Sequence, residues 1–349
     1  MKTKAILSFI SLLILGSGCA SLASVKTSRL DLIQSRNVLK CGVSGKIPGF
    51  SFLQSDGTYQ GMDVDICKAM AAAFLGDANK VVYRPLTAPE RFTALNTGEI
   101  DLLSRNTTFN LSRDSNGGNN VAFAPVIFYD GQSFMVKRDS GIRRIEELAS
   151  ANICVGSGTT TEQNLYDTFS ERNIEYTPVK FQDINQVIEA YQKGRCIAMT
   201  SDRSQLFAAK SSFKESDDHI ILDEIISKEP LAPASIGTDQ KLSDAMRWTI
   251  YALFQAEEMG ISSENIDLKV LEAYNNENLT TLRRFFGIEG SLGDKLGLPN
   301  DFVVKIIQST GNYSEIYDRN LGPENELYIP RGLNSSYIDG GLLFSPPFK

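Results

Sequence analysis

The sequence predicts an α/β protein built from two similar halves, and three observations support this prediction. Its 349 residues are enough for two domains, because one domain usually takes about 100–200 residues. Apolar residues make up 42% of the chain and charged residues 22%, which is typical of a globular protein and excludes a disordered, collagen-like or coiled-coil chain. Short strand-type segments alternate with helical segments twice along the chain, which indicates mostly parallel sheets covered by helices.

Strand and helix signals alternate along the first half of the chain. Residues 63–75 place Val64, Met70 and Phe74 at helical spacing, which predicts an amphipathic helix. Gly98 ends a second, shorter helix at 90–97. A βαβα order of this kind predicts parallel strands with helices on both faces of the sheet. The strands expected in this half lie at 38–43, 50–52, 81–83 and 100–103.

The second half repeats this order. We expect strands at 134–136, 153–155, 179–181 and 197–199, and helices at 145–148, 161–170 and 185–193. Pro230 and Pro233 then make residues 228–234 an extended segment. Two long helices and a Gly- and Pro-rich segment that we expect to lie against the first half follow at 243–259, 301–310 and 331–349.

The N-terminus has the pattern of a secretory signal peptide. Two lysines lie within Met1–Lys4 and precede the apolar run Ala5–Leu15, which is shorter than the roughly 20 residues that a membrane-spanning helix needs. Small residues in the segment 21–23 predict cleavage after residue 23, so that residues 1–23 form the signal peptide. Alternatively, the segment 16–19 resembles a lipoprotein box with a lipid-anchored Cys19, although its leucine stands one position too far away. Both interpretations place the mature protein in the periplasm.

Charge and composition exclude several classes of function. Lysine and arginine number 35 against 42 aspartates and glutamates, and no dense basic run is present, which argues against nucleic-acid binding. The single histidine, His219, lies in a polar stretch and is expected on the surface, which disfavours histidine-based metal sites and catalysis. Apart from Cys19 the chain has four cysteines, and an even number in an exported protein predicts two disulfides. The spacing alone allows three connectivities.

Eight segments of the chain, taken in order, carry a family resemblance. They are KCGVSGKIPGFSF (40–52), GMDVDICK (61–68), RFTALNTGEIDLLSRNTTFNLS (91–112), YDGQSFMV (129–136), GSGTTTEQ (156–163), GRCIAM (194–199), IISKEPLAP (225–233) and KLGLPNDFV (295–303). The sequence thereby resembles the amino-acid-binding proteins of ABC importers, solute-binding protein family 3, and in particular the general L-amino-acid-binding subfamily.

The resemblance implies the fold of a type II periplasmic binding protein, with two lobes joined by a hinge that the chain crosses twice. Lobe 1 would comprise residues 37–131 and 232–349, including a C-terminal extension, and lobe 2 residues 132–231. Pairing within each half favours the disulfides Cys41–Cys67 and Cys154–Cys196. The implied function is a monomeric substrate-binding subunit that captures polar or broad-range L-amino acids by hinge closure and delivers them to an inner-membrane permease and its ATPase. No cofactor and no reaction are expected.

An amino-acid ligand requires charge-assisted hydrogen bonds for both its carboxylate and its ammonium group. Arg113 occupies the position of the family's carboxylate-binding arginine, and a surface arginine paired with Asp114 is the alternative. Asp202 occupies the position that holds the ammonium group, and a helix N-cap for residues 203–209 is the alternative. The resemblance places Asn106 and Thr108 in a loop that contacts the ligand.

Thr159 and Glu162 have the spacing of a capping box, and the helix that they begin offers free amides to a carboxylate. The adjacent Thr160 matches a ligand-contacting position of the family. Phe50 either packs on the methylene groups of the ligand or fills the core of lobe 1.

Two departures from the family bear on specificity. The stretch 44–47 lacks the acidic and aromatic residues of binders selective for basic side chains, and Ala88 or Pro89 replaces an expected aromatic platform. These departures predict a pocket without a strong preference for lysine or arginine, in which Lys46 and Arg105 could assist an acidic or amide side chain. The enzymatic alternative is an exported cyclohexadienyl dehydratase, which would need an acid or base free in the cleft.

Overall fold

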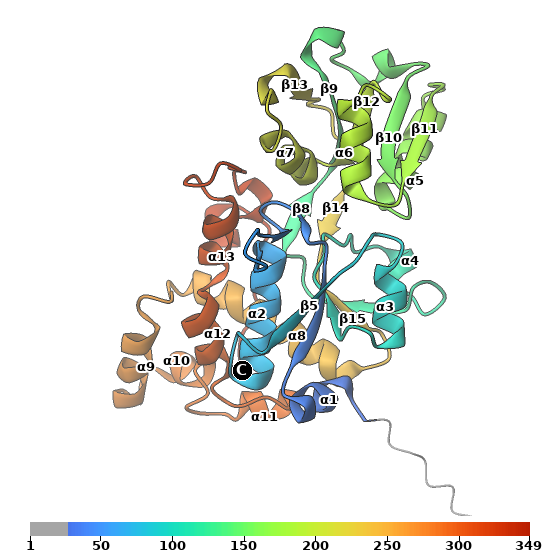
Figure 1. Ribbon diagram of the computed structural model, residues 1–349. Coiled ribbons are helices and arrows are strands. Elements are labelled where there is room, and N and C mark those ends of the chain that lie inside the picture. The colour runs from blue at the N-terminus through green and yellow to red at the C-terminus, as the bar shows by residue number, and fades with distance from the viewer. Residues whose placement is uncertain (1–26) are drawn as a thin grey trace, which may run out of the picture.

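The computed structural model describes residues 27–349 and shows two lobes, one above the other in Figure 1. The predicted signal peptide and Cys19 lie outside the described residues. Within residues 27–349 no helix is long and apolar enough to cross a membrane.

Lobe 1 is built on a five-stranded sheet in the order β5-β1-β6-β15-β7. Strand β1 pairs in parallel with β5 and β6, whereas β15 runs antiparallel to β6 and β7. The strands are β1 (Leu39–Val43), β5 (Val81–Pro85), β6 (Leu102–Leu103), β7 (Val121–Phe123) and β15 (Ala234–Ile236), beside a small sheet of β2 (Lys46–Ile47), β3 (Ser51–Leu53) and β4 (Tyr59–Gln60). The helices of this lobe are α1 (Arg29–Arg36), α2 (Met62–Leu75), α3 (Arg91–Thr97), α4 (Leu111–Asp114) and α8 (Gln240–Glu258).

Lobe 2 repeats the arrangement with the order β11-β10-β12-β9-β13. Strand β10 is parallel to β11 and β12, and β9 is antiparallel to β12 and β13. Its strands are β9 (Gln132–Lys137), β10 (Asn152–Gly156), β11 (Thr177–Phe181), β12 (Ala198–Asp202) and β13 (His219–Ile221). Its helices are α5 (Thr160–Glu171), α6 (Ile184–Gln192) and α7 (Arg203–Ser211), with 3₁₀ turns η1 (Arg138–Ser140), η2 (Ile145–Leu148) and η3 (Ser216–Asp218).

Two strands connect the lobes and lie side by side between them (Figure 1). Strand β8 (Phe128–Asp130) leads into lobe 2, and β14 (Glu229–Leu231) leads back and pairs antiparallel with it. The chain therefore crosses a two-stranded hinge, as predicted. Because β9 and β15 each start at this hinge, they enter their sheets against the direction of the parallel strands.

The C-terminal part of the chain packs on the outer face of lobe 1, where α12 lies along α2 (Figure 1). Alanines at 69 and 71–73 are fully buried in α2, and their small side chains let α12 approach closely. Asn334 then reaches the hinge, where its side chain accepts a hydrogen bond from the Tyr129 amide at 2.6 Å. The elements of this extension are α9 (Ile266–Asn275), α10 (Thr280–Phe285), α11 (Leu292–Leu296), α12 (Phe302–Thr310), α13 (Tyr313–Leu321), η4 (Gly332–Asn334) and η5 (Tyr337–Asp339).

Each lobe contains one disulfide, and both predicted pairings are confirmed. Cys41 on β1 is bonded to Cys67 on α2, and Cys154 on β10 is bonded to Cys196 just before β12. The sequence separations are 26 and 42 residues. Loop-closure entropy for such loops corresponds to about 3.5–4 kcal/mol of stability for each bond.

Candidate functional site

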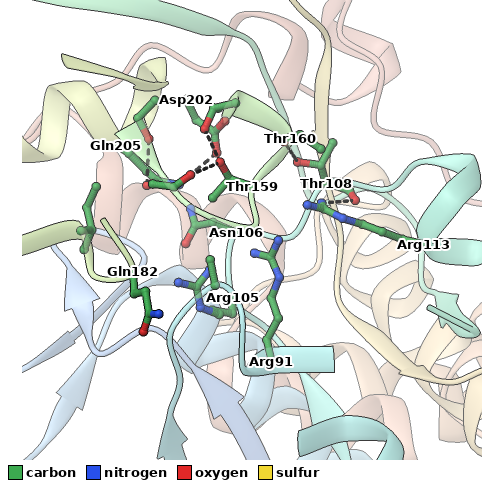
Figure 2. A pocket seen from close by; sticks show the side chains of 15 residues that line it. Arg91, Arg105, Asn106, Thr108, Arg113, Thr159, Thr160, Gln182, Asp202 and Gln205 are labelled. Atoms are coloured by element: carbon green, nitrogen blue, oxygen red, sulfur yellow. Dashed lines mark hydrogen bonds between the residues drawn. The ribbon is translucent and has the colours of Figure 1, made fainter. Parts of the chain in front are cut away.

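A pocket lies between the lobes, at the carboxyl ends of the strands of both sheets, which is where open α/β sheets bind ligands (Figure 2). Lobe 1 contributes residues from the start of α3, the loop after β6 and helix α4. Lobe 2 contributes residues that follow β10, β11 and β12. The polar and charged residues that line the pocket include Arg91, Arg105, Asn106, Thr108 and Arg113 from lobe 1, and Thr159, Thr160, Gln182, Asp202 and Gln205 from lobe 2.

Arg113 is 6% exposed and lines the pocket from α4. Its backbone amide donates to the Asn110 side chain, which begins this short helix. One guanidinium nitrogen, Nη1, donates to the Thr108 carbonyl at 2.8 Å, so the guanidinium is fixed while its other N–H groups remain available. Burial lowers the pKa of Arg113 to about 10, although Glu229 and Asp202 act in the opposite direction. Burial of Arg113 excludes the alternative of a surface arginine paired with Asp114.

Asp202 faces the pocket from the end of β12 and is 4% exposed. Its Oδ2 accepts a hydrogen bond from Gln205 at 2.9 Å, whereas its Oδ1 is buried without a partner in the described part of the chain. The Asp202 side chain accepts no capping hydrogen bond from α7, which argues against the N-cap alternative. Burial, Asp130 and Glu229 raise the pKa of Asp202 well above its ordinary value. A cation placed against Oδ1 would offset both the burial and the repulsion.

Asn106 stands between the two lobes on the loop after β6. Its φ of 38° is a left-handed conformation that asparagine tolerates better than most residues. Its amide donates to the buried Asp63 at 3.3 Å, and the Ser104 hydroxyl donates to the same carboxylate, so Asp63 holds the loop from behind. Both side-chain atoms of Asn106 are buried without a hydrogen-bond partner within residues 27–349. This amide group is therefore free to bind a ligand.

Thr108 of lobe 1 and Thr160 of lobe 2 meet at Glu229 of the hinge. The two hydroxyls donate to the same carboxylate oxygen, Oε2, at 2.6 and 2.8 Å. Glu229 is 1% exposed, and its Oε1 accepts from Asn164 and Ser227. Each threonine has used its single donor on Glu229, so toward the pocket it offers only an acceptor.

Thr159 caps α5 in the predicted manner. Its hydroxyl accepts from the Glu162 amide at 3.0 Å and donates to the Gly156 carbonyl at 2.7 Å. Glu162 in turn accepts from the Gly158 amide at 2.8 Å. The Thr159 side chain thus shapes the start of the helix, and the partial positive charge of the helix N-terminus faces the pocket.

The comparisons with known proteins agree with this geometry. The sequence pattern of bacterial extracellular solute-binding proteins, family 3, matches residues 39–323. The chain belongs to this family. It is 45% identical over 351 residues to the general L-amino acid-binding periplasmic protein AapJ of Rhizobium johnstonii, and 42% identical over 349 residues to the glutamate/glutamine/aspartate/asparagine-binding protein BztA of Rhodobacter capsulatus. Both alignments cover 100% of each chain.

Solved structures place the chain in the same family. An ABC transporter periplasmic binding protein from Brucella ovis with glutathione bound is 42% identical and superimposes with a TM-score of 0.87, covering 93% of this chain and 100% of that one. The predicted type II periplasmic binding fold is confirmed. The relatives are named as periplasmic binding proteins, which indicates an extracytoplasmic location for this solute-binding protein.

The sequence indicates only one of the two remaining arginines in the pocket. It suggests Arg105 as an aid to side-chain binding, whereas it does not lead to Arg91. Arg91 is 2% exposed and lies in the first turn of α3, where a positive charge opposes the helix dipole. This unfavourable position is the sequence signal that Arg91 has a role inside the protein, because an arginine on the surface gains no stabilisation from the helix dipole there. Gln182 and Gln205 follow β11 and β12 and were also missed.

Of the two alternatives for Phe50, contact with the ligand is wrong and the core position is confirmed, and the surface position predicted for His219 is wrong. Phe50 is 2% exposed and packs edge-to-face on Phe128 in the core of lobe 1, with ring centroids 5.2 Å apart, so it does not line the pocket. His219 is buried at 7% exposure, not on the surface, because its ring packs on Phe213 and its Nδ1 lies 2.7 Å from the Tyr191 hydroxyl. His219 is not among the residues that line the interlobe pocket.

Proposed function

We propose that this protein is the periplasmic substrate-binding subunit of an ABC importer and captures polar or broad-range L-amino acids between its lobes. One observation carries the proposal: Arg113 of lobe 1 and the unpartnered Oδ1 of Asp202 in lobe 2 face the same cavity. A guanidinium matches a carboxylate, and a carboxylate oxygen matches an ammonium group. This pair of groups suits a free amino acid and not an uncharged sugar.

The ligand's two charged groups then have complementary partners from both lobes. Arg113 and the free amides at the start of α5 bind the α-carboxylate. Asp202 binds the ammonium group, and the hydroxyl oxygens of Thr108 and Thr160 accept from it because their own hydrogens point to Glu229. Removing either group of the ligand leaves a buried charge without its partner, which costs several kcal/mol.

We infer that contacts between the lobes and at the hinge favour the closed form. Lys46 of lobe 1 forms an ion pair with Asp183 of lobe 2 across the mouth of the cleft. Thr108 and Thr160 share Glu229 at the hinge. The loop 107–109 is tied to the hinge as well, since the Phe109 amide donates to the Pro230 carbonyl at 2.8 Å. Ligand contacts to both lobes add to these bonds and shift the population toward the closed form.

Delivery to a membrane permease and its ATPase is the remaining step, and we infer that the protein acts as a monomer without a cofactor. We also infer that it catalyses no reaction. Asp202 is the single carboxylate that lines the described pocket, and binding an ammonium group occupies it. The division proposed is lobe 1 at 37–131 and 232–349 and lobe 2 at 132–231, after a signal peptide at 1–23. Ordinary cleavage and a lipid anchor on Cys19 both fit this function.

A thermal-shift screen against the twenty L-amino acids tests the proposal, with D-isomers and prephenate as controls. A ligand at 100 times its Kd stabilises the folded state by about 2.7 kcal/mol, which raises Tm measurably. We expect shifts with several L-amino acids and none with their D-isomers. Turnover of prephenate without any response to amino acids would contradict the proposal and favour the dehydratase.

A further inference from the structure

Within the described part of the chain, the hinge strand β8 has a strand neighbour on one side only. It pairs with β14, and the residue of β14 opposite Tyr129 is Pro230, which has no amide hydrogen to donate. In an antiparallel pair, alternate residues direct their N–H and C=O groups away from the partner strand. Tyr129 presents both backbone groups to this outer edge of the hinge, where they need other partners.

Asn334 of the C-terminal extension provides both partners. Its Oδ1 accepts from the Tyr129 amide at 2.6 Å, and its Nδ2 donates to the Tyr129 carbonyl at 3.3 Å. The side chain of Asn334 thus takes the place of a neighbouring strand at this one residue. Asn334 is 4% exposed, so water has little access to the side chain that makes these two bonds.

A largely buried ion pair holds Asn334 in position. Arg331 donates from Nε and Nη2 to the Asn334 carbonyl at 3.1 and 2.9 Å, and it forms two hydrogen bonds to the carboxylate of Glu257 in α8, at 2.7 and 3.1 Å. Its guanidinium also lies 5.3 and 5.5 Å from the ring centroids of Tyr313 and Tyr317 in α13. The turn that contains Asn334 is therefore anchored to two helices of lobe 1.

Helix α13 also contacts the two residues that precede Tyr129, and it lies beside β8 in Figure 1. The Tyr313 hydroxyl donates to the Ile127 carbonyl at 2.5 Å, and Tyr313 is fully buried. The ring of Phe128 is stacked on that of Tyr317, with centroids 6.2 Å apart. Three consecutive residues at the start of the hinge are thus attached to the C-terminal part of lobe 1.

The next two residues are attached to lobe 2. Oδ2 of Asp130 accepts from the Ser204 amide at 3.2 Å, and the Gly131 carbonyl accepts from the Arg203 amide at 2.8 Å. Both amides belong to the first turn of α7. The change of attachment from lobe 1 to lobe 2 therefore falls between Tyr129 and Asp130.

The returning segment changes its attachment at the same level. The Ile226 amide donates to the Gln132 carbonyl of lobe 2 at 3.0 Å, whereas the Pro230 carbonyl accepts from the Phe109 amide of lobe 1 at 2.8 Å. Pro230 faces Tyr129 in the register of the two hinge strands. Both crossings thus pass from one lobe to the other within the same few residues.

We propose that Asn334 is a positioning residue for the hinge: it fixes β8 to lobe 1 as far as Tyr129, so that lobe 2 turns about the junction of Tyr129 and Asp130. This inference rests on the proposed function, because the turn serves ligand capture. The bonds of Asn334 lie within lobe 1 and the hinge residues attached to it, so they form in both the open and the closed protein. They restrict the open form more, because contacts between the lobes already restrict the closed form. Asn334 thereby raises the closed fraction, and every ligand gains affinity by the same factor.

Isothermal titration calorimetry with L-glutamate, L-glutamine and L-serine tests this role. Asn334→Ala removes both bonds to the hinge, and Asn334 is not among the described residues that line the pocket. Freeing one backbone residue shifts an equilibrium by about 5- to 30-fold, so we expect the Kd of each probe that binds to rise by one common factor in this range. Tyr313→Phe, which removes another bond to the hinge, should act in the same direction. Asn325→Ala is the matched control, because Asn325 donates to the Asp318 and Gly322 carbonyls within the extension, and it should leave each Kd unchanged.

Hydrogen exchange of the ligand-free proteins tests the position of the junction independently of any ligand. Asn334→Ala should speed exchange of the Tyr129 amide by about fivefold or more and leave the amides of Arg203 and Ser204 unchanged, because these belong to lobe 2.

Unchanged exchange at Tyr129 would overturn the role of Asn334. So would Kd values within about twofold of the wild type, losses that differ between probes by more than about threefold, or an equal loss in Asn325→Ala. Absence of binding by every L-amino acid would overturn the proposed function, and hydrogen exchange would still decide whether Asn334 fixes the hinge strand.

Discussion

Replacing Arg113 by methionine removes the guanidinium but keeps an unbranched side chain that can fill the same space. Arg113 is 6% exposed, so water has little access to its guanidinium, and within residues 27–349 that guanidinium donates one hydrogen bond, to the Thr108 carbonyl. Removing one partner of a buried ion pair costs about 3–5 kcal/mol, because the other charge stays buried and unpaired. The Kd for an L-amino acid should therefore rise by about 10²- to 10⁴-fold.

Calorimetric titration of the variant with L-glutamate measures this loss directly. Arg84→Met is the control, because it also replaces an arginine of lobe 1 by methionine but acts on an exposed pair. Arg113→Lys should recover part of the affinity, since the charge returns without the planar pair of donors. A Kd for Arg113→Met within about threefold of the wild-type value, in a protein of unchanged Tm, would refute the assignment of the carboxylate site.

Further predictions concern the hinge, the buried acids and a disulfide. Glu229→Gln replaces one of two fully used carboxylate oxygens by a donor, so either the two threonines or Asn164 and Ser227 lose their acceptor, and calorimetry should show about tenfold weaker binding. Burial raises the pKa of Asp63 to about 6, so the folded state holds this proton more tightly than the unfolded chain. Its contribution to stability is therefore full below about pH 4 and is lost as pH rises through 6; urea melts should show the wild type losing stability relative to Asp63→Asn over this interval, and a constant difference would contradict the shift. Replacing Cys154 and Cys196 together by serine should lower the free energy of unfolding by about 4 kcal/mol in denaturant melts, and an unchanged midpoint would show that the bond constrains nothing.

Much of the fold and part of the site could be predicted because the relevant residues follow strands. Arg113 and Thr160 come after parallel strands and Asp202 is the last residue of one, and such ends converge on one edge of a sheet. The pairing of the cysteines could be predicted because the strand–helix order divides the chain into two halves, and each disulfide lies within one of them. Local sequence therefore identified some of the residues that each lobe brings to the cleft.

The remaining features depend on contacts between distant parts of the chain. Arg91 lies in the first turn of a short helix, and its burial in the pocket between the lobes depends on residues far away in the sequence. Glu229 binds two threonines that lie 121 and 69 residues away, which no local pattern can indicate. His219 follows a run of polar residues, yet Tyr191 and Phe213 cover it. The sequence allows Phe50 to lie either in the core or in the cleft, and its edge-to-face contact with Phe128 places it in the core.

A crystal structure of the protein grown with saturating L-glutamate tests the central claim most directly. The account predicts one ligand between the closed lobes, with its α-carboxylate on Arg113 and its ammonium group against Oδ1 of Asp202. A ligand bound with its ammonium group away from Asp202, or a cleft without ligand in a protein that calorimetry shows to be saturated, would contradict it.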